Sequence, residues 1–271
     1  MTPIGIFDSG YGGLTVLKEI VRELPQYDYI YLGDNARNPY GTRSYEVVYQ
    51  FTLECVKKLF SMGCQLVILA CNTASAKALR TIQQKDLSNM DSNRRVLGVI
   101  RPSSEVIGDY SKTRKVGVLG TSGTIISNSY EIEIKKLFPD IEVYQQACPM
   151  WVPLIENAEH LSPGADYFVE KYTQSLLEQN SKIDTIILGC THYPLLYDKI
   201  TNQLPKSVRL ISQGSIVASS LKDYLLRHAD MDNRCSKTGT QRFLTTDSTE
   251  IFDQRASIFF GKDVTSEHLA L

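Results

Sequence analysis

Short apolar runs alternate with longer amphipathic stretches along the chain. Strand-length runs rich in Val, Ile and Leu occupy residues 3–8, 27–34, 64–70, 94–100, 115–120, 141–147, 184–189, 208–212 and 242–247. Apolar residues at helical spacing occupy 14–25, 43–63, 73–84, 129–139, 166–180, 195–205, 215–228 and 251–261. Continuous apolar strands that alternate with helices are typical of parallel sheets covered on both faces. The pattern therefore predicts an α/β fold with mainly parallel sheets.

The strand–helix pattern runs through two similar halves. VILACNT at residues 67–73 and IILGCTH at residues 186–192 each place a cysteine where an apolar strand ends, which we interpret as a weak internal repeat. We expect two similar open α/β domains. The first comprises residues 1–100 plus 212–271, and the second comprises residues 101–211. The polar segment 85–95 lacks apolar periodicity and is predicted to be an exposed loop.

Composition and charge limit the classes of function. The formal net charge is −1, which argues against a broad electrostatic surface for nucleic acid or an anionic membrane. The N-terminus lacks the basic and apolar regions of a signal peptide, and the apolar runs are too short to span a bilayer. We therefore expect a cytoplasmic protein. Its six cysteines form no C-x-x-C pair, so free thiols are expected rather than a disulfide framework.

Polar and nucleophilic residues follow the predicted strands at their carboxyl ends, where ligands bind in open parallel sheets. Taken singly, a strand-end cysteine is more often a small buried apolar residue, and Thr or Asn after a strand is a common helix cap. Two thiols at matching positions, each followed by short polar side chains, favour a shared function. The strand-end candidates are Asp8, Ser9, Asp34, Cys71, Asn72, Thr73, Thr121, Ser122, Thr124, Cys148, Glu156, Cys190, Thr191 and His192.

Two thiols that face each other suit the inversion of a carbon centre. A base on one face removes a proton and an acid on the opposite face delivers one, with a thiolate and a thiol in these roles. Backbone N–H groups at the helix starts after Cys71 and Cys190 could bind a substrate carboxylate. His192 and Asp8 could move protons to or from the thiols. Because a negative charge opposes thiolate formation, we interpret Asp8 as a proton acceptor or ammonium partner.

Five motifs in order resemble the cofactor-independent glutamate racemases, which make D-glutamate for bacterial peptidoglycan. They are GIFDSGYGGLTVL (5–17), GDNARNPYG (33–41), LACNTASA (69–76), ACPMWVPLIE (147–156) and GCTHYPLL (189–196), and they span most of the chain. The resemblance implies two α/β domains with the active site in the cleft between them and glutamate as the substrate. It implies neither pyridoxal phosphate nor a metal as cofactor, and it favours a homodimer.

The resemblance also assigns roles to individual residues. It implies Cys71 and Cys190 as the acid/base pair, with Cys71 handling the α-proton of D-glutamate and Cys190 that of L-glutamate. In the family, further side chains support the two thiols, and they correspond to Asp8, Glu156 and His192 in this sequence. Substrate contacts correspond to Asp8, Ser9, Tyr40, Gly41, Asn72, Thr73, Thr191 and His192.

The chain departs from the family pattern at positions other than the two thiols. Asn35 and Asn38 stand where the family often has Thr and an apolar residue, and Trp151 stands where Phe is common. The polar loop 86–95 is longer than usual. Family members that a peptidoglycan precursor activates carry a longer N-terminus, so we expect no such activation here.

Three alternative functions fit parts of the sequence. An aspartate racemase is the nearest, but that group resembles C-N-T-A-H and C-T-E where this chain reads C-N-T-A-S and C-T-H. A metal-binding regulator could ligate zinc through Cys71, Cys190, His192 and Asp8, although C-T-H lacks the spacing usual for structural zinc. A phosphate loop at G-Y-G-G-L-T (10–15) matches neither nucleotide-binding motif. Its glycines are expected to let the backbone turn tightly beside the substrate.

The remaining thiols and imidazoles are interpreted as structural. Cys55 and Cys64 should pack in the core, whereas Cys235, in a polar stretch, should be exposed and oxidisable. Cys148 lies near the site by motif, without a role in proton transfer. Surface positions are expected for His160, His228 and His268, and no role is assigned to Asp34 and Asp247.

Overall fold

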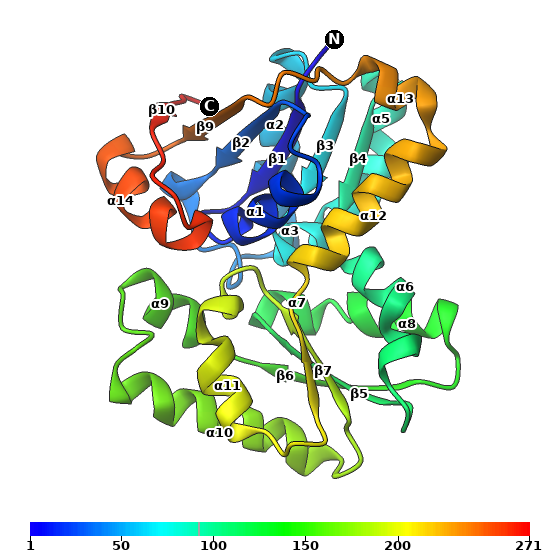
Figure 1. The fold of residues 1–271 in the computed structure, drawn as a ribbon, viewed down its shortest axis with the longest axis vertical. Coiled ribbons are helices and arrows are strands. Elements are labelled where there is room, and N and C mark those ends of the chain that lie inside the picture. The colour runs from blue at the N-terminus through cyan, green and yellow to red at the C-terminus, as the bar shows by residue number, and fades with distance from the viewer. Residues whose placement is uncertain (92) are drawn as a thin grey trace.

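Two parallel sheets form the framework of the protein. A computed structural model describes residues 1–91 and 93–271. The larger sheet has the strand order β10-β9-β2-β1-β3-β4 and the smaller has the order β6-β5-β7-β8, with all described pairings parallel. Figure 1 shows the sheets in two separate lobes, which we call the first and the second lobe. The predicted fold class, α/β with mainly parallel sheets, is confirmed.

Each lobe contains its sheet and the helices that pack on it. The first-lobe strands are β1 (Ile4–Asp8), β2 (Tyr29–Gly33), β3 (Leu66–Leu69), β4 (Arg95–Gly98), β9 (Gln241–Thr245) and β10 (Ser266–His268). The second-lobe strands are β5 (Lys115–Gly120), β6 (Glu142–Ala147), β7 (Thr185–Gly189) and β8 (Arg209–Ile211).

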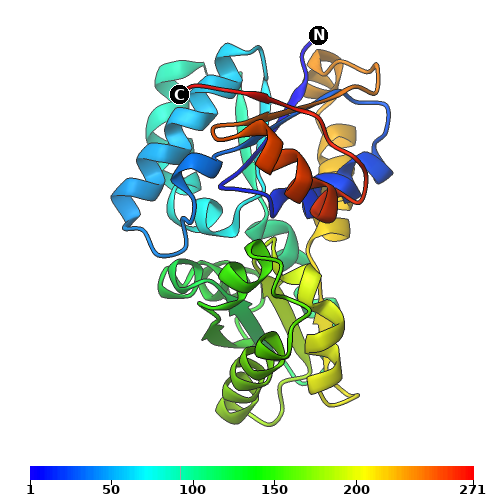
Figure 2. The same cartoon turned by 90° about the vertical axis from the view of Figure 1, so that its left-hand side faces the viewer.

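Helices cover both faces of each sheet, as Figures 1 and 2 show. On the first lobe, α1 (Gly13–Glu23), α12 (Gly214–Arg227) and α14 (Thr249–Phe260) lie on one face, opposite α2 (Tyr45–Ser61), α3 (Asn72–Lys77), α4 (Leu79–Thr81) and α5 (Leu87–Met90). On the second lobe, α6 (Ile100–Tyr110) and α8 (Ser129–Leu137) lie opposite α10 (Pro163–Gln179) and α11 (Tyr197–Gln203). Shorter elements are α7 (Ser122–Ile126), α9 (Trp151–Glu156), α13 (Ala229–Arg234) and the 3₁₀ turns η1 (Asn35–Arg37) and η3 (Tyr193–Leu196).

Burial explains why the strands have continuous apolar sequences. β1, β2 and β7 are buried along their whole length, because helices cover the sheet on both sides and neither side-chain direction reaches water. The helices instead bury one stripe. In α1 the stripe includes Leu14, Leu17 and Ile20, at three-residue intervals, as expected for a helix with one face on a sheet.

The order of the strands repeats between the lobes. The first lobe contains the order β2-β1-β3-β4 and the second contains β6-β5-β7-β8. β3 and β7, which precede Cys71 and Cys190, therefore occupy equivalent places, in agreement with the weak repeat in the sequence.

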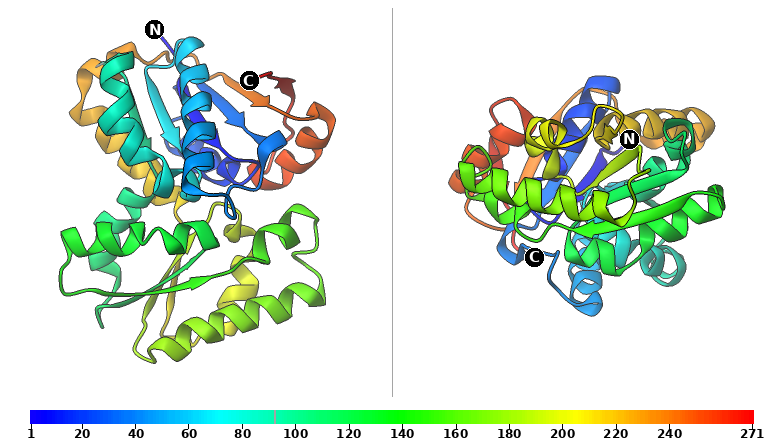
Figure 3. Two further views of the ribbon diagram at one scale, coloured as in Figure 1. Left: turned by 180° about the vertical axis from the view of Figure 1, so that it is seen from behind. Right: turned by 90° about the horizontal axis from the view of Figure 1, so that it is seen from below.

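The chain crosses between the lobes twice, beside Val99 after β4 and beside Gln213 after β8. The C-terminal segment then adds β9 to β2 of the first sheet. Figure 3 shows from behind that both termini lie on the first lobe. The domain boundaries at residues 100 and 212 stay a prediction.

Residues 85–90, within the segment predicted to be an exposed loop, are helical instead. A π-helical turn over Ile82–Asp86 leads directly into α5. Ile82 is buried, and Leu87 and Met90 pack against the same first-lobe core. These three apolar residues are spaced by five and three positions, which suits a π turn followed by an α turn and hides the helical period. Ser92, within the predicted loop, lies outside the described residues.

Cys235 is buried, so the prediction that it is exposed and oxidisable is wrong. Its side chain is 2% exposed. The flanking backbone pairs with the N-terminus, because Thr2 N–H donates to Arg234 O at 2.8 Å and Ser236 N–H donates to Thr2 O at 2.9 Å. This pairing covers the thiol although its neighbours in the sequence are polar.

The other cysteines and histidines outside the cavity largely agree with the sequence. All six cysteines are free and buried, including Cys55 and Cys64, as expected for core packing. His228 and His268 are exposed, as predicted, whereas His160 is half-buried.

A buried carboxylate fastens the segment before β9 to the start of β2. Asp28 Oδ1 accepts hydrogen bonds from the backbone N–H groups of Thr238 (3.1 Å) and Thr240 (2.8 Å) and from their hydroxyls (2.7 and 2.8 Å). Burial disfavours the charge, but hydrogen bonds from Ser236, Thr238 and Thr240 outweigh it and lower the pKa of Asp28 far below its usual value.

Asp28→Asn should lower the free energy of unfolding by about 1–3 kcal/mol at neutral pH, because a charged acceptor of several hydrogen bonds is lost. A depressed pKa stabilises the fold above the unfolded-state pKa of about 4, and this stabilisation is lost as the pH falls. The difference between wild type and variant should therefore shrink below about pH 4. Urea unfolding at neutral pH and below about pH 4 measures this difference in the free energy of unfolding. Asp263→Asn, at an exposed carboxylate, is the control. A variant as stable as wild type at neutral pH would contradict this account.

Candidate active site

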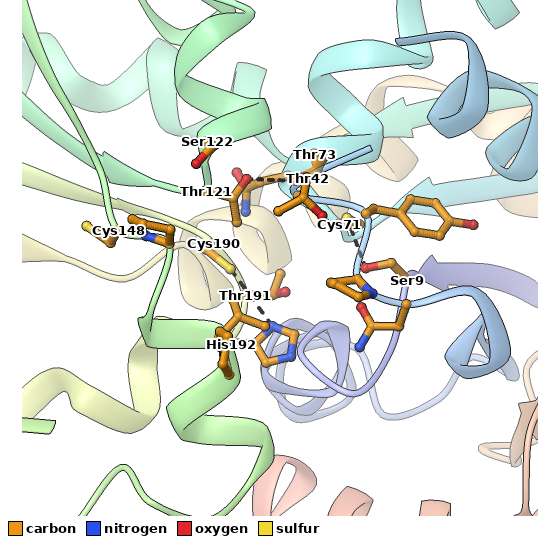
Figure 4. Close-up of a pocket in the computed structure, with 18 residues that line it drawn as sticks. Ser9, Thr42, Cys71, Thr73, Thr121, Ser122, Cys148, Cys190, Thr191 and His192 are labelled. Carbon is orange, nitrogen blue, oxygen red and sulfur yellow. Dashed lines mark hydrogen bonds between the residues drawn. The ribbon is translucent and has the colours of Figure 1, made fainter. Parts of the chain in front are cut away.

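One small cavity lies between the carboxyl edges of the two sheets (Figure 4). Its volume is about 80 Å³. That is room for roughly five to eight water molecules at 10–15 Å³ each, so the cavity suits a molecule of amino-acid size. The first lobe lines it with Ser9, Asn38, Pro39, Tyr40, Gly41, Thr42, Cys71, Asn72 and Thr73, and the second with Thr121, Ser122, Cys148, Pro149, Val152, Pro153, Cys190, Thr191 and His192.

The structure gathers most of the residues that the sequence singled out. Cys71 and Cys190 reach the cavity from opposite lobes, and each is 6% exposed. Figure 4 shows Cys71 with Ser9 on one side and Cys190 with His192 on the other. Asp8 and Glu156 are not among the lining residues and lie behind them. The other predicted substrate contacts, Ser9, Tyr40, Gly41, Asn72, Thr73, Thr191 and His192, all line the cavity.

Cys71 occupies the N-cap position of α3. Its Sγ accepts a hydrogen bond from Ala74 N–H at 3.4 Å and lies 3.5 Å from Ser9 Oγ. These donors favour a negative sulfur, but burial and the neighbouring Asp8 carboxyl outweigh them and raise the pKa of Cys71 to about 12. Cys71 is therefore a neutral thiol at neutral pH in this structure.

Cys190 lies beside a buried ion pair. Its Sγ is 3.8 Å from His192 Nδ1, and His192 Nε2 is 2.9 Å from Glu156 Oε1. Burial opposes the charge on His192, but Cys190 and Glu156 together raise its pKa well above the usual value. Burial also opposes the charge on Glu156, yet His192 and Asn38 lower its pKa. Both directions agree on an imidazolium–carboxylate pair next to the Cys190 sulfur.

Two first-lobe residues support this ion pair from across the cavity. Asn38 Nδ2 donates to Glu156 Oε1 at 2.7 Å. The Phe259 ring of α14 meets the His192 ring edge-on, with centroids 5.3 Å apart. Asn38 thus forms a hydrogen bond between the lobes at the carboxylate that holds His192.

Asp8 is completely buried between the lobes. Its Oδ2 accepts from Gly10 N–H at 2.9 Å, and its Oδ1 accepts from Thr191 Oγ1 at 3.4 Å. Burial raises the pKa of Asp8, against the opposing effect of His192 and the backbone hydrogen bonds. A carboxyl group with a raised pKa exchanges its proton closer to neutral pH, which suits a proton acceptor beside a thiol.

The loop that carries Tyr40 and Gly41 is anchored by Asp34, which received no role from the sequence. Asp34 Oδ2 accepts hydrogen bonds from the Tyr40 hydroxyl and, at 2.7 Å, from Arg37 Nε. Gly41 C=O accepts from Gly123 N–H of the second lobe at 2.8 Å. Because the Tyr40 hydroxyl is held by Asp34, a ligand meets the Tyr40 ring and the loop backbone instead.

Asn72 is held by two residues that the sequence analysis missed. Asn72 Nδ2 donates to Gln213 Oε1 at 2.8 Å, and Tyr130 Oη donates to Asn72 Oδ1 at 2.7 Å. Gln213 follows the predicted strand 208–212, so the strand-end rule that selected the other candidates could have found it. Tyr130 lies within an amphipathic helix, where no sequence signal separates it from a core aromatic residue.

Gly12 gives the second lobe room to approach, rather than an unusual backbone angle. A Cβ atom at Gly12 would lie 2.4 Å from both His192 Nδ1 and Thr191 Oγ1. Gly10, Gly12 and Gly13 all keep φ outside the left-handed region. At Gly12, the missing side chain therefore serves a close contact between the lobes, whereas a Cβ atom at Gly13 would meet Asp8 and Ala70 of the same lobe.

Neither a metal cluster nor a membrane helix is found where the structure describes the chain. Among residues 1–91 and 93–271, no group of three His, Cys, Asp or Glu side chains is placed to hold a metal ion. The four side chains of the zinc alternative, Asp8, Cys71, Cys190 and His192, therefore do not form such a group. In the same residues, no helix has the length and apolar character needed to cross a membrane.

Comparison with known proteins gives consistent matches over the whole chain. The sequence model of the family described as Asp/Glu/Hydantoin racemase matches residues 4–221. A relative named glutamate racemase, from Listeria innocua, is 41% identical over 271 residues, which cover 99% of this chain and 98% of the relative.

Two solved structures of glutamate racemases share the fold. That of isoform RacE1 from Bacillus anthracis has a TM-score of 0.90 and 36% identity, covering 100% of this chain and 98% of that one. That of the Francisella tularensis enzyme in complex with D-glutamate has a TM-score of 0.87 and 32% identity, covering 99% and 97%.

The family match spans both strand-end thiols and their neighbours Asp8 and His192. The relatives match at 32–41% identity over nearly the full length of each chain. The protein is thus an isomerase that belongs to the Asp/Glu/Hydantoin racemase family, in the group of the glutamate racemases.

Proposed function

We propose that this protein interconverts L-glutamate and D-glutamate by proton transfer between Cα and two thiols. One observation carries the proposal: Cys71 and Cys190 reach a single cavity of amino-acid size from opposite lobes. Two thiols on opposite sides of a bound carbon atom meet the requirement for inverting it. The choice of glutamate is supported by the names of the relatives and by the Francisella tularensis enzyme in complex with D-glutamate.

In the L-to-D direction Cys190 acts as the base and Cys71 as the acid. The Cys190 sulfur takes the α-proton, the electron pair of the broken C–H bond spreads into the α-carboxylate, and the Cys71 thiol protonates the opposite face. Local electrostatics support these roles. A positive His192 ring lies 3.8 Å from Cys190 Sγ, whereas Cys71, with its pKa raised to about 12, holds a proton to deliver.

In the D-to-L direction the roles exchange, so Cys71 must first lose its proton. The Ala74 N–H and the Ser9 hydroxyl are placed to stabilise the resulting thiolate. Asp8 is the neighbouring group that accepts the proton. The α-ammonium group of the substrate adds a positive charge next to this pair and favours the thiolate further.

The polar residues around the thiols are proposed to bind the substrate. N–H groups at the start of α3 and the 38–41 backbone suit carboxylate oxygens. After Cys190 the chain forms the 3₁₀ turn η3 before α11, so the second expected helix start is only a short turn. The proposed substrate contacts are the cavity-lining residues Ser9, Tyr40, Gly41, Asn72, Thr73, Thr191 and His192. Asp8, predicted as a further contact, does not line the cavity and is proposed to act through its hydrogen bond with Thr191.

The wider role of the enzyme follows from the family resemblance. We propose that its D-glutamate supplies peptidoglycan synthesis and that it works in the cytoplasm without pyridoxal phosphate or a metal. A homodimer also stays a prediction from the family.

Replacement of either thiol should stop racemisation. Cys71→Ser and Cys190→Ser are each expected to lower the conversion rate by about 10²–10⁴-fold, because a serine hydroxyl is a poor substitute for a positioned thiol acid or base. Conversion and solvent-deuterium incorporation at Cα are measured for each enantiomer, without added cofactor. Residual exchange is expected only in L-glutamate for Cys71→Ser and only in D-glutamate for Cys190→Ser.

Cys235→Ser, a buried thiol outside the cavity, is the control and should retain the wild-type rate per folded protein. A wild type that neither converts nor exchanges glutamate would remove the proposed function. Faster turnover of aspartate than of glutamate would transfer the assignment to the aspartate racemases.

Glu156→Gln should shift the pH dependence of the reaction. Without the carboxylate, the pKa of His192 falls toward its usual value, so the imidazolium beside Cys190 is lost at lower pH. The alkaline limb of the kcat/KM profile for L-glutamate should move down by roughly one pH unit or more. At neutral pH, kcat should fall about tenfold.

Glu159→Gln changes a nearby exposed carboxylate and is the matched control for this profile. If Glu156→Gln lowers kcat while the alkaline limb stays in place, Glu156 does not act through the charge of His192.

A further inference from the structure

We propose that Gln213 and Tyr130 are positioning residues that fix Cys71 and Asn72 relative to Cys190. Neither residue lines the cavity. The inference rests on the proposed two-thiol function and concerns what sets the relative positions of the two thiols.

Asn72, Gln213 and Tyr130 form a closed ring of hydrogen bonds. Asn72 Nδ2 donates to Gln213 Oε1 at 2.8 Å, and Gln213 Nε2 donates to Tyr130 Oη at 2.7 Å. Tyr130 Oη then donates to Asn72 Oδ1 at 2.7 Å. The three residues are 2%, 3% and 0% exposed, respectively. At this burial, breaking one bond leaves its partner without water to replace it, so the ring resists displacement of any member.

Gln213 also joins the two places where the chain crosses between the lobes. It lies on the second crossing, directly before α12. Its Nε2 is 3.1 Å from Val99 O and 2.9 Å from Ser103 Oγ, which lie on the first crossing and at the start of α6. The same amide group that holds Asn72 therefore ties both connecting segments together.

Tyr130 links the two strand-end thiols from behind. Its hydroxyl holds Asn72, the residue after Cys71. Its ring packs on Gly189, the residue before Cys190, with Cε2 only 3.1 Å from where a Cβ atom at Gly189 would stand. One rigid side chain thus spans from the backbone next to one thiol to the backbone next to the other.

The hydrogen-bond ring of Asn72, Gln213 and Tyr130 affects the position of Cys71 more than that of Cys190. Loss of the Tyr130 hydroxyl frees Asn72 and with it the turn that carries Cys71. The aromatic ring of residue 130 still packs on Gly189, next to Cys190. With L-glutamate, Cys190 would still remove the α-proton, but delivery from Cys71 would slow, and Cys190 would return a solvent-exchanged proton to the same face. With D-glutamate, the slow step would precede carbanion formation, so no extra exchange of unconverted substrate is expected.

The test compares Tyr130→Phe with Tyr29→Phe in D₂O. Tyr29 is a matched control, because its buried hydroxyl donates to Leu24 O at 2.8 Å and lies outside the cavity. Tyr130→Phe should lower kcat by roughly 10- to 100-fold, as expected for a misplaced acid, with a much smaller change in KM. The ratio of deuterium in recovered L-glutamate to deuterium in the D-glutamate product should rise, without a corresponding rise from D-glutamate.

A second variant and a substrate-free measurement keep the two proposals separate. Gln213→Met removes the other side of the ring and should change the ratio in the same direction. The alkylation rate of Cys71 by iodoacetamide, followed by peptide mass spectrometry, should increase roughly two- to tenfold in both variants, the range expected from one lost hydrogen bond in a local opening. Tyr29→Phe should leave it at the wild-type rate.

The outcomes distinguish the positioning role from a purely structural one. If Tyr130→Phe and Gln213→Met lose thermal stability but keep the wild-type deuterium ratio and the wild-type Cys71 alkylation rate, the inference is wrong. If wild type fails to convert glutamate while the variants still increase Cys71 alkylation, the proposed function fails and the positioning of Cys71 by the ring is supported.

Discussion

The carboxyl edges of two parallel sheets meet across one small cavity, and this arrangement imposes the chemistry of its walls. In a parallel sheet every strand ends at the same edge, so the residues after β1, β3, β5 and β7 converge there. Those residues are mostly short and polar, and the side chains of Cys71, Asn72, Thr73, Cys190, Thr191 and His192 are almost completely buried. Each polar group must therefore find a partner within the protein, and many of these partners lie on the opposite lobe.

The partners make the two sides of the cavity electrostatically different. The Cys190 sulfur has the His192 imidazolium beside it, supported by Glu156. The Cys71 sulfur has the Asp8 carboxyl as its charged neighbour and remains a thiol. Two thiols at equivalent strand ends thus have neighbours of opposite charge, an imidazolium beside Cys190 and a carboxyl group beside Cys71. The repeated strand order places the two thiols at equivalent positions, and neighbours that differ between the lobes, His192 and Glu156 on one side and Asp8 on the other, make their electrostatic surroundings different.

Contacts between the lobes also limit how the cavity changes shape. Asn38 reaches Glu156, Gly41 reaches Gly123, and the ring of Asn72, Gln213 and Tyr130 ties the active-site turn to both chain crossings. At Gly12, even one added carbon would meet His192 and Thr191. The distance between the thiols is therefore set by buried hydrogen bonds and close backbone contacts that connect the lobes, rather than by either lobe alone.

The sequence by itself determined the α/β class, the parallel strands and the residues at their carboxyl ends, because hydrophobic period and strand ends are local properties. It also identified Cys71, Cys190 and their neighbours through motifs in the order typical of the family. It failed for Cys235, where pairing with the N-terminus overrode local polarity, and for residues 85–90, where a π turn leads into a helix. Only the tertiary structure decided which polar groups face each other. Gln213 stands 141 residues from Asn72 in the chain, and the charge on His192 depends in part on Glu156 reaching its ring in three dimensions. No local pattern encodes such contacts, since they depend on how two separately formed sheets come together.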